Sequence, residues 1–380
     1  MANVKLSNVI RRAQTKVDKD DTDLVFYVGG EHIESENIRV HSRGIIAEST
    51  IGPMFYYGFK AGDFLLVSRN PHLKKAGLVD FDGICSEKTF VLETANSDVL
   101  LPEFLPFVLQ NERFWDYAYR HRHGSTNTFI NWSTLANYEF ELPDLETQRK
   151  LAEVLWSIND TMEAYKNLIS ATDELVKSQF MEQFGDPSNN VYGYPVTTLK
   201  EVAVGPLSYG SVSSATEFDG ITRYVRITDI MDDGNLGRDI KSATKTEAKY
   251  LLHEGDILFA RTGATVGKTC RYRENYGRAI YAGFLIRLIP DTTLIDPDYL
   301  YHFTKSDYYW YFVRSAQRVV AQPNINAQEY GDLQILLPKI EAQKSFAAFV
   351  QQSDKSKFEL EQALAELNAT YKRIIAENLG

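Results

Sequence analysis

The sequence predicts an α+β protein in which two mixed α/β domains alternate with two long helices that pair inside the chain. Two observations predict this: one unit of domain plus helix occurs twice, and each copy ends in a stretch with helical heptad spacing. The repeat is plainest where LPDLETQ, Leu142–Gln148, returns as LPKIEAQ, Leu337–Gln343, 195 residues later. Self-similarity at so long a period indicates a duplicated structural unit.

The duplication extends well beyond this motif. The same offset places Trp115 on Trp310 and Ile130-Asn131 on Ile325-Asn326, and the register holds from residue 103 to residue 185. Further upstream, GDFLLVSR and GDILFAR match at an offset of 193 residues. The chain therefore divides into a domain at 1–141, a helix at 142–186, a second domain at 187–336 and a second helix at 337–380.

A long helix is predicted over Asp144–Phe184 because apolar residues alternate in steps of four and three, as in the seam of a coiled coil. Pro143 precedes the helix and Gly185 follows it, both at positions these residues favour. The first seam comprises Leu151, Leu155, Ile158, Met162, Tyr165, Ile169 and Val176. The second comprises Phe346, Val350, Leu360, Leu364, Leu367 and Tyr371, and is weakened by Ser353 and Lys357.

Each helix alone would expose an apolar stripe to water, so pairing the two helices is the economical arrangement. The alternative is that each stripe packs on its own domain. At about 1.5 Å per residue, 36 residues make a rod of about 55 Å, long enough to hold two domains apart.

The globular parts are predicted to be mixed. The runs FLLVS, KTFVLE, DILFA and GFLIRLI are rich in β-branched and aromatic residues and predict strands. The aromatic stretches Phe104–Tyr119 and Tyr299–Arg314 each predict one helix per domain. Such aromatic density favours a helix core over base stacking.

Length and composition indicate a soluble cytoplasmic protein. A chain of 380 residues with 44% hydrophobic and 24% charged residues has room for two domains, each with a core. The two cysteines, Cys85 and Cys270, match no metal spacing and fit a reducing compartment. No stretch has the length of a signal peptide core or of a membrane span, so no membrane partner is expected.

The net charge of −10 argues weakly against a nucleic-acid partner, but the charge is uneven. Residues 144–189 contain four Lys and Arg against nine Asp and Glu. Between Arg261 and Arg287 there are six Lys and Arg against the single acid Glu274. This basic run favours a DNA-binding surface in the second domain.

Catalytic motifs are absent or broken. TGATVGKT, Thr262–Thr269, lacks the first glycine of a phosphate-binding loop. Asp239 with Glu247 and Lys249 forms a nuclease-like pattern that is common by chance, and His121 and His123 have no third metal ligand nearby. No dinucleotide loop, nucleophile elbow or methyltransferase motif occurs. The sequence therefore predicts a binding protein with no metal site.

Several motifs in order resemble the specificity (S) subunit of Type I restriction–modification enzymes. They are GDILFARTGATVGK, QPNIN at Gln322–Asn326 and ILLPKIEAQ, with the looser first copy GSTNTFINWS and FELPDLETQ. NPHLKKAGLVDFDGICSEKTFVL, Asn70–Leu92, also resembles a first target-recognition domain of that family. The first copy departs from the family at Thr126-Asn127-Thr128, where a glutamine-centred stretch is usual.

The resemblance implies two target-recognition domains, each reading one half of a split double-stranded DNA site, and an antiparallel coiled coil of the two conserved helices. It implies a non-catalytic subunit with two methyltransferase (modification) subunits docked on the helices, and restriction/translocase subunits that move and cut DNA. S-adenosylmethionine, ATP and Mg²⁺ are then expected on the partners, and none of them on this chain.

Basic and amide side chains are the expected DNA contacts, because arginine reads guanine bidentately and lysine holds phosphate. The candidates are Arg69, Asn70, Lys74, Lys75, Arg120 and Arg122 in the first domain, and Arg261, Lys268, Arg271, Arg273 and Arg278 in the second. Two other hypotheses stay open: a coiled-coil adaptor that binds only protein, and a nuclease with a cryptic carboxylate site.

Overall fold

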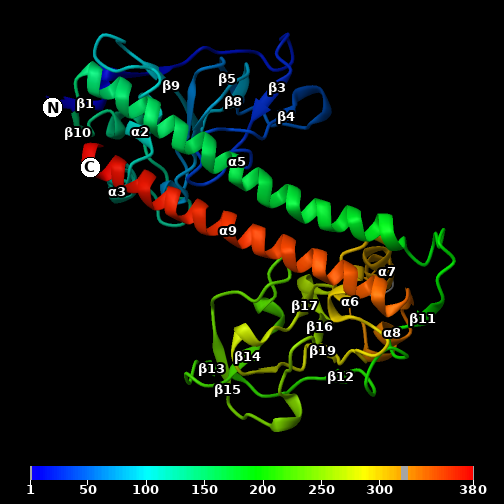
Figure 1. Cartoon of the computed structure of the whole chain (residues 1–380). Helices are drawn as coiled ribbons and strands as arrows, with labels where there is room; N and C mark the ends of the chain where they lie inside the picture. The colour runs from blue at the N-terminus through cyan, green and yellow to red at the C-terminus, as the bar shows by residue number, and fades with distance from the viewer. Residues whose placement is uncertain (1, 318–323, 380) are drawn as a thin grey trace. The chain divides into compact units, whose positions relative to one another are not determined.

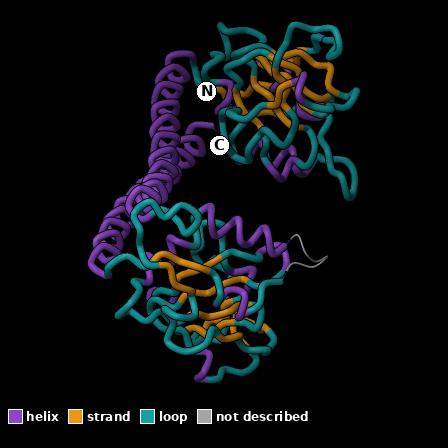
Figure 2. The backbone as a smooth tube through the Cα atoms, turned by 90° about the vertical axis from the view of Figure 1, so that its right-hand side faces the viewer, coloured by secondary structure: helices purple, strands orange, loops and turns teal. Residues whose placement is uncertain are grey.

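The computed structural model describes residues 2–317 and 324–379 of the chain. The chain divides into two compact units, residues 1–166 with 362–380, and residues 167–361. Each unit contains one globular domain and one part of each long helix. Within each domain the strands gather in the interior and loops surround them (Figure 2).

The long helices are α5 (Leu145–Phe184) and α9 (Ile340–Leu379), of 40 residues each (Figure 1). Asp144 caps α5, because its Oδ1 accepts a hydrogen bond of 2.8 Å from the Thr147 amide. Gly185, with φ of 69°, terminates it in the left-handed region that glycine tolerates. The predicted start at Asp144 is thus the cap rather than the first helical residue.

The two helices pack together in opposite directions within each unit. In unit 1, Leu155 near the start of α5 belongs to the same core as Ile375 near the end of α9. In unit 2, Phe180 near the end of α5 packs with Phe346 near the start of α9, with ring centroids 5.5 Å apart. The structure is therefore α+β with an antiparallel helix pair, as the sequence and the resemblance predict.

The first domain contains two four-stranded sheets. One has the antiparallel order β2 (Ile10–Ala13), β9 (Thr89–Thr94), β6 (Phe64–Val67) and β7 (Ala76–Leu78). The other has the order β4 (Gly44–Ile45), β3 (Phe26–Val28), β8 (Gly83–Ser86) and β5 (Phe55–Phe59), with β3 and β8 parallel. Strands β1 (Ala2–Lys5) and β10 (Glu139–Leu142) form a separate antiparallel pair, and the short helices are α1 (Leu6–Val9), α2 (Leu105–Leu109), α3 (Glu112–Arg120) and α4 (Trp132–Leu135).

The second domain repeats the β2-β9-β6-β7 sheet of the first domain, and we call this sheet the principal sheet of each domain. In the second domain its antiparallel order is β12 (Ser208–Tyr209), β19 (Leu285–Leu288), β16 (Ile257–Ala260) and β17 (Thr269–Arg271). The parallel pair of the first domain returns as β14 (Arg223–Val225) with β18 (Ala279–Tyr281). The remaining elements are the pairs β11 (Val196–Thr198) with β20 (Gln334–Leu336) and β13 (Ala215–Glu217) with β15 (Lys241–Ala243), and helices α6 (Pro297–Phe303), α7 (Asp307–Gln317) and α8 (Ala327–Gly331).

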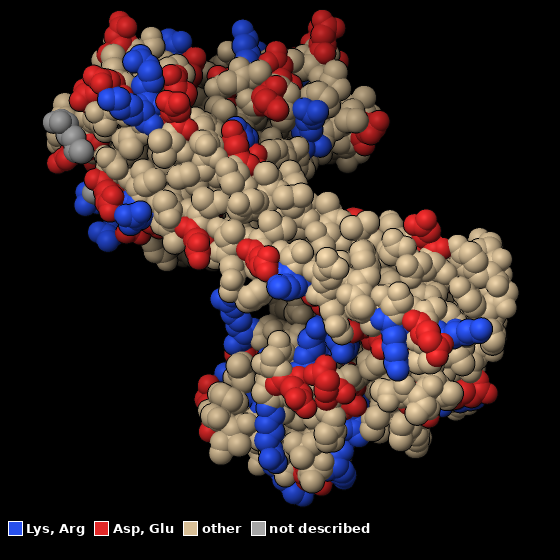
Figure 3. Space-filling view, in the orientation of Figure 1, with Lys and Arg blue, Asp and Glu red and all other residues tan. Residues whose placement is uncertain are grey.

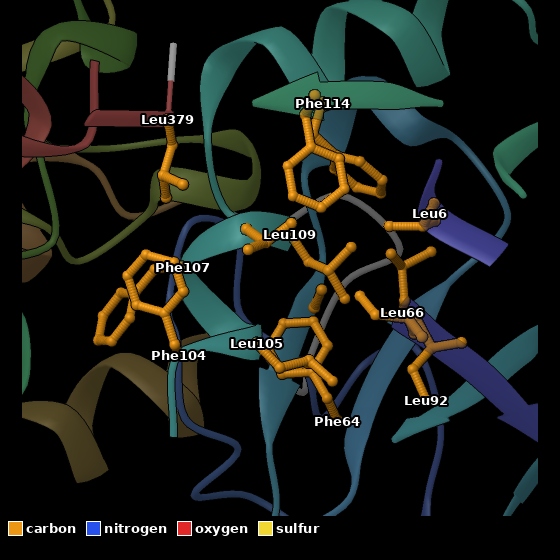
Figure 4. Close-up of a cluster of buried hydrophobic side chains, with 14 of the residues drawn as sticks. Leu6, Phe64, Leu66, Leu92, Phe104, Leu105, Phe107, Leu109, Phe114 and Leu379 are labelled. Atoms are coloured by element: carbon orange, nitrogen blue, oxygen red, sulfur yellow. The ribbon is translucent and has the colours of Figure 1, made fainter. Parts of the chain in front are cut away.

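The core of unit 1 joins its sheet to its helices (Figure 4). Phe64 of β6, Leu92 of β9 and Phe104 point into one cluster with Phe107 of α2 and Leu379 of α9. These side chains are at most 3% exposed. At about 1.5–3 kcal/mol for each fully buried side chain, this burial holds the end of α9 on the domain.

The two aromatic segments are each broken into two helices, so the prediction of one helix per domain is wrong. Asn111 separates α2 from α3, and its side chain accepts a hydrogen bond of 2.8 Å from the Phe114 amide. The residue 195 positions later, Ser306, precedes α7, and its Oγ accepts 3.3 Å from the Tyr309 amide. Short polar side chains compete for backbone donors in this way, and start a new helix instead of continuing the old one. Tyr299 and Tyr309 are nonetheless buried, as a core helix requires.

The repeated LPxxExQ motif has a structural explanation in its glutamine. Gln148 is fully buried; its Oε1 accepts 2.9 Å from the Leu101 amide, and its Nε2 donates to the carbonyls of Val99 and Pro143. Gln343 makes the same three bonds 195 residues later, with the Asp296 amide at 2.8 Å and the carbonyls of Leu294 and Pro338. Each glutamine thus ties the start of a long helix to a loop of its own domain.

Candidate nucleic-acid interface

The two domains share one backbone arrangement where the central strand of the principal sheet ends. In the first domain, the Ser68 amide donates 2.7 Å to the Lys88 carbonyl, and the Ile130 amide donates 2.9 Å to the Ser68 carbonyl. In the second, the Arg261 amide donates 3.1 Å to Phe284, and Ile325 donates 2.9 Å to Arg261. The strand end, the neighbouring turn and the Ile-Asn segment therefore meet in the same way in both domains.

In both domains the asparagine of the Ile-Asn repeat stands at the N-cap of the next helix. In the second domain, Asn326 caps α8 by accepting 2.9 Å from the amides of Gln328 and Glu329, and Glu329 accepts 2.7 Å from the Asn326 amide. This capping box defines where the loop ends. Gln322 and Pro323 of the QPNIN stretch lie outside the described residues.

In the second domain the shared arrangement carries a group that we call the Arg261 surface: Tyr209, Val212, Arg261, Phe284 and Asn324. The Nε of Arg261 donates 3.1 Å to Oδ1 of Asn324, and its guanidinium lies 4.8 Å from the centre of the Tyr209 ring. Val212 is 97% exposed and Phe284 59% exposed. Exposed apolar side chains beside an arginine are typical of a binding surface.

In the first domain the corresponding edge carries Arg69, Asn70 and Lys75. Arg69 is exposed and lies two residues after the end of β6, and Asn70 has φ of 49°, which asparagine tolerates better than most residues. The Asn70 amide donates 2.7 Å to the Thr128 carbonyl, and Lys75 Nζ donates 2.6 Å to Gly30 O. These residues line a hollow of about 470 Å³.

The other first-domain candidates lie around α3. Lys74 is paired with Glu36 at 3.1 Å and with Glu112 at 2.7 Å. Arg120 is largely exposed and 3.9 Å from Asp116, while Arg122 stacks on the Tyr119 ring at 3.8 Å.

The two histidines next to Arg122 in the sequence contact a backbone carbonyl and an aromatic ring. His121 Nδ1 lies 2.9 Å from the Tyr117 carbonyl, and the ring of His123 packs 5.7 Å from that of Phe129. Among the described residues, no group of three or more His, Cys, Asp or Glu is arranged to hold a metal ion.

The basic run of the second domain is offset by acids from elsewhere in the chain. Lys268 pairs with Asp232 at 2.6 Å and Arg273 with Asp354 at 2.8 Å. Arg271 lies 2.8 Å from Asp298. Arg278 is exposed. On the face drawn in Figure 3, basic and acidic side chains are interspersed rather than gathered into one basic patch.

Arg271 neutralises the buried carboxylate of Asp298. This carboxylate is 2% exposed, and burial raises its pKa, which Arg271 and Arg273 oppose. A buried charge without a partner is strongly destabilising. The acids that neutralise the basic run come from segments up to 81 residues away, so a local count along the sequence does not find them.

Each unit also contains a cavity between its domain and its helix segments, of about 410 Å³ in unit 1 and 560 Å³ in unit 2. The linings correspond at the 195-residue offset. Gln110, Asn159 and Lys372 line the first cavity, where Lys305, Asp354 and Lys177 line the second. In the second cavity, burial lowers the pKa of Lys305 to about 8 and that of His302 to about 3.

The architecture defines a class of duplicated proteins: two domains build the same strand end, and each domain packs on the paired long helices. The profile of the family described as "Type I restriction modification DNA specificity domain" matches residues 11–171 and 194–369. The chain belongs to this family, whose specificity subunits are the non-catalytic component of the Type I complex.

Comparison with individual proteins also finds specificity subunits of Type I systems. The chain is 26% identical over 132 residues to the Type I restriction enzyme HindI specificity subunit of Haemophilus influenzae; the match covers 33% of this chain and 28% of that protein. The fold resembles the Type I S subunit from M. genitalium, with a TM-score of 0.62, 14% identity and coverage of 100% of this chain and 96% of that one. It also resembles a chain solved in work on complex assembly and conformational transition of the type I R-M system, with a TM-score of 0.56, 19% identity and coverage of 99% and 97%. Within the described residues, no helix is long and apolar enough to cross a membrane.

Proposed function

We propose that this chain is the DNA-recognition subunit of a Type I restriction–modification complex, in which residues 1–141 and 187–336 each read one half of a bipartite duplex site. The carrying observation is one backbone arrangement with different side chains: the position of Ser68 holds Arg261, and that of Lys88 holds Phe284. A duplicated scaffold that carries different side chains at equivalent positions suits two heads reading different sequences.

The helices at 142–186 and 337–380 are proposed to set the distance between the half-sites and to dock two methyltransferase subunits. None of the thirteen predicted seam residues is exposed, whereas Val154, Leu168 and Leu175 of α5 are 47–52% exposed. Their spacing by multiples of seven keeps these three side chains near one helix face. Such an unpaired apolar stripe on an acidic helix suits a protein partner better than DNA.

The partners are proposed to carry the cofactors. Methyltransferase subunits bring S-adenosylmethionine, and restriction/translocase subunits use ATP and Mg²⁺, while this chain supplies the DNA sequence preference. The assembled complex acts in the cytoplasm, where bacterial DNA lies.

Among the candidate contacts, geometry favours Arg69, Asn70 and Lys75 in the first domain and Arg261 and Arg278 in the second. Arg120, Arg122 and Lys268 suit phosphate contacts at the edge of the DNA-binding surface. Arg120 is largely exposed and Arg122 is partly exposed, and the carboxylate that pairs with Lys268 is itself exposed. Lys74, Arg271 and Arg273 have carboxylate partners within 3.2 Å. Lys74 and Arg271 are assigned to holding their domains together, and Arg273 to holding the second domain on α9.

The test is to map methylated bases by single-molecule sequencing in cells with and without this chain. The expected result is one bipartite motif that disappears with the chain and returns with it. Failure to find such a motif, together with salt-independent behaviour of the purified complex toward duplex DNA, would show a protein-binding adaptor instead.

A further inference from the structure

The Arg261 surface contains an arginine that is held in place before any ligand binds. Its Nε is engaged by Asn324 Oδ1 at 3.1 Å, and its plane is supported by the Tyr209 ring at 4.8 Å. Tyr209 is itself fixed, because its hydroxyl accepts 3.0 Å from the Ala327 amide. Two elements distant in sequence thus restrict one long side chain.

Across residues 2–317 and 324–379, neither Nη1 nor Nη2 of Arg261 has a hydrogen-bond or ion-pair acceptor. This contrasts with Arg271 and Arg273 of the same basic run, whose Nη groups meet carboxylates at 2.8 Å. A guanidinium that is held at Nε, and whose Nη atoms meet no acceptor in the described part of the chain, has the fork geometry that fits two adjacent acceptors.

The surroundings point to a base edge rather than a phosphate. Phe284 and Val212 stand on neighbouring turns, joined where the Gly283 amide donates 2.7 Å to the Ser211 carbonyl. Both side chains are mostly exposed. Exposed apolar side chains on the turns next to Arg261 would exclude water from a groove floor, and they offer nothing to a charged backbone.

The arginine is also not required by the shared scaffold. The first domain builds the same strand end with Ser68, which is buried and whose Oγ donates 2.7 Å to the Lys88 carbonyl. The side chain at this position is therefore available for recognition in the second domain alone.

From these observations we infer that the second domain reads a guanine through Arg261, with Nη1 and Nη2 donating to O6 and N7 in the major groove and with Tyr209 and Asn324 as positioning residues. The inference rests on the proposed function and adds to it a base identity in one half-site. A bidentate contact of this kind discriminates by roughly 5- to 150-fold against another base pair.

The experiment uses the complete methyltransferase complex and competition binding with duplexes in which each base pair of the second half-site is replaced in turn. Wild type should show one G·C position where replacement costs roughly 5- to 150-fold in affinity. Arg261→Ala should lose discrimination at that position only. Arg261→Lys should lose it too while keeping the salt dependence of binding, because lysine retains the charge without the fork.

The positioning residues are tested through the same readout. Tyr209→Phe keeps the ring and should keep the guanine preference, whereas Tyr209→Leu should weaken it at that one position. Arg238→Ala removes an exposed arginine outside the Arg261 surface and is the matched control, with no expected change in base preference.

Two results would overturn the inference: unchanged discrimination in both Arg261 variants, or a loss of affinity equal at all positions, which marks a phosphate contact. A wild-type complex without any bipartite site would instead refute the proposed function. The two failures are therefore distinguishable.

Discussion

His302 of α6 shows how burial fixes the charge of one side chain. Its ring makes edge contacts with those of Tyr301 and Phe346, with centroids 5.4 Å from each. Burial is the main cause of its low pKa of about 3, and the nearby cations Lys305, Arg273 and Arg271 lower the pKa further. The imidazole is therefore neutral in the folded protein at all but strongly acidic pH.

This predicts an acid-sensitive second unit. Below pH of about 6.5 the unfolded chain binds a proton at His302, while the folded chain does not until about pH 3, so the free energy of unfolding falls across that window. From pH 7 to pH 5 the loss from this one group is about 2 kcal/mol. His302→Phe should remove that part of the pH slope in urea unfolding, and a slope equal to wild type would contradict the burial argument.

At the scale of elements, the junction between each domain and its long helix depends on one glutamine. Gln343 satisfies one amide and two carbonyls from a fully buried position. No other side chain of similar size offers both an acceptor and two donors for these groups.

Gln343→Leu should destabilise unit 2 by about 2–4 kcal/mol, because it leaves buried backbone groups unpaired. Hydrogen exchange at the Asp296 amide should accelerate in the same variant. The matched control is Gln351→Leu on the exposed face of α9, expected to change the free energy of unfolding by less than about 0.5 kcal/mol. Equal changes in the free energy of unfolding for the two substitutions would show that Gln343 does not stabilise the junction between the second domain and α9.

If the helix pair sets the distance between the two half-sites, lengthening both helices should lengthen the spacer of the recognised DNA site. One heptad inserted after Tyr165 and one after Leu360 keep both seams in phase and fall close to the boundaries between the two compact units. Seven residues add about 10 Å, or about three base pairs of duplex, so the methylated motif should gain a longer spacer with unchanged half-sites.

Methylation at the longer spacer should be weaker, because about three base pairs also rotate one half-site by roughly 100°. A four-residue insertion in one helix should do worse, since it moves the apolar stripe out of register. A folded double-insertion variant that still methylates only the original spacing would show that the helices do not set the distance.

At the scale of the whole molecule, the duplication makes each domain a candidate for exchange. The β11–β20 pair joins the two ends of the second domain, and the Gln343 junction marks where the domain meets α9. Replacing residues 190–336 with the corresponding domain of a relative should change one half of the methylated motif and leave the other half as it was. Sequencing of modified bases checks this, and a simultaneous change in both halves would contradict separate reading.

The sequence by itself determined the features that depend on local periodicity. The four-three spacing from Leu151 to Val176, with Pro143 and Gly185 marking the ends, predicted α5 to within one residue. The runs around Phe64 and Ile257 predicted strands of the sheets. The offset of 195 residues predicted two copies of one unit. Such patterns are readable because side-chain periodicity and the face that a helix or strand buries are linked directly.

Only the tertiary structure decided which charged side chains form ion pairs and which side chains contact one another. It broke the aromatic helices at Asn111 and Ser306, because each cap bond depends on local geometry that hydrophobicity does not encode. It paired Arg271 with Asp298 and set Arg261 against Tyr209, partners 27 and 52 residues apart in the chain. Electrostatic and stacking energies depend on distances of a few ångströms in space, and sequence separation carries no information about these until the sheets and helices have packed.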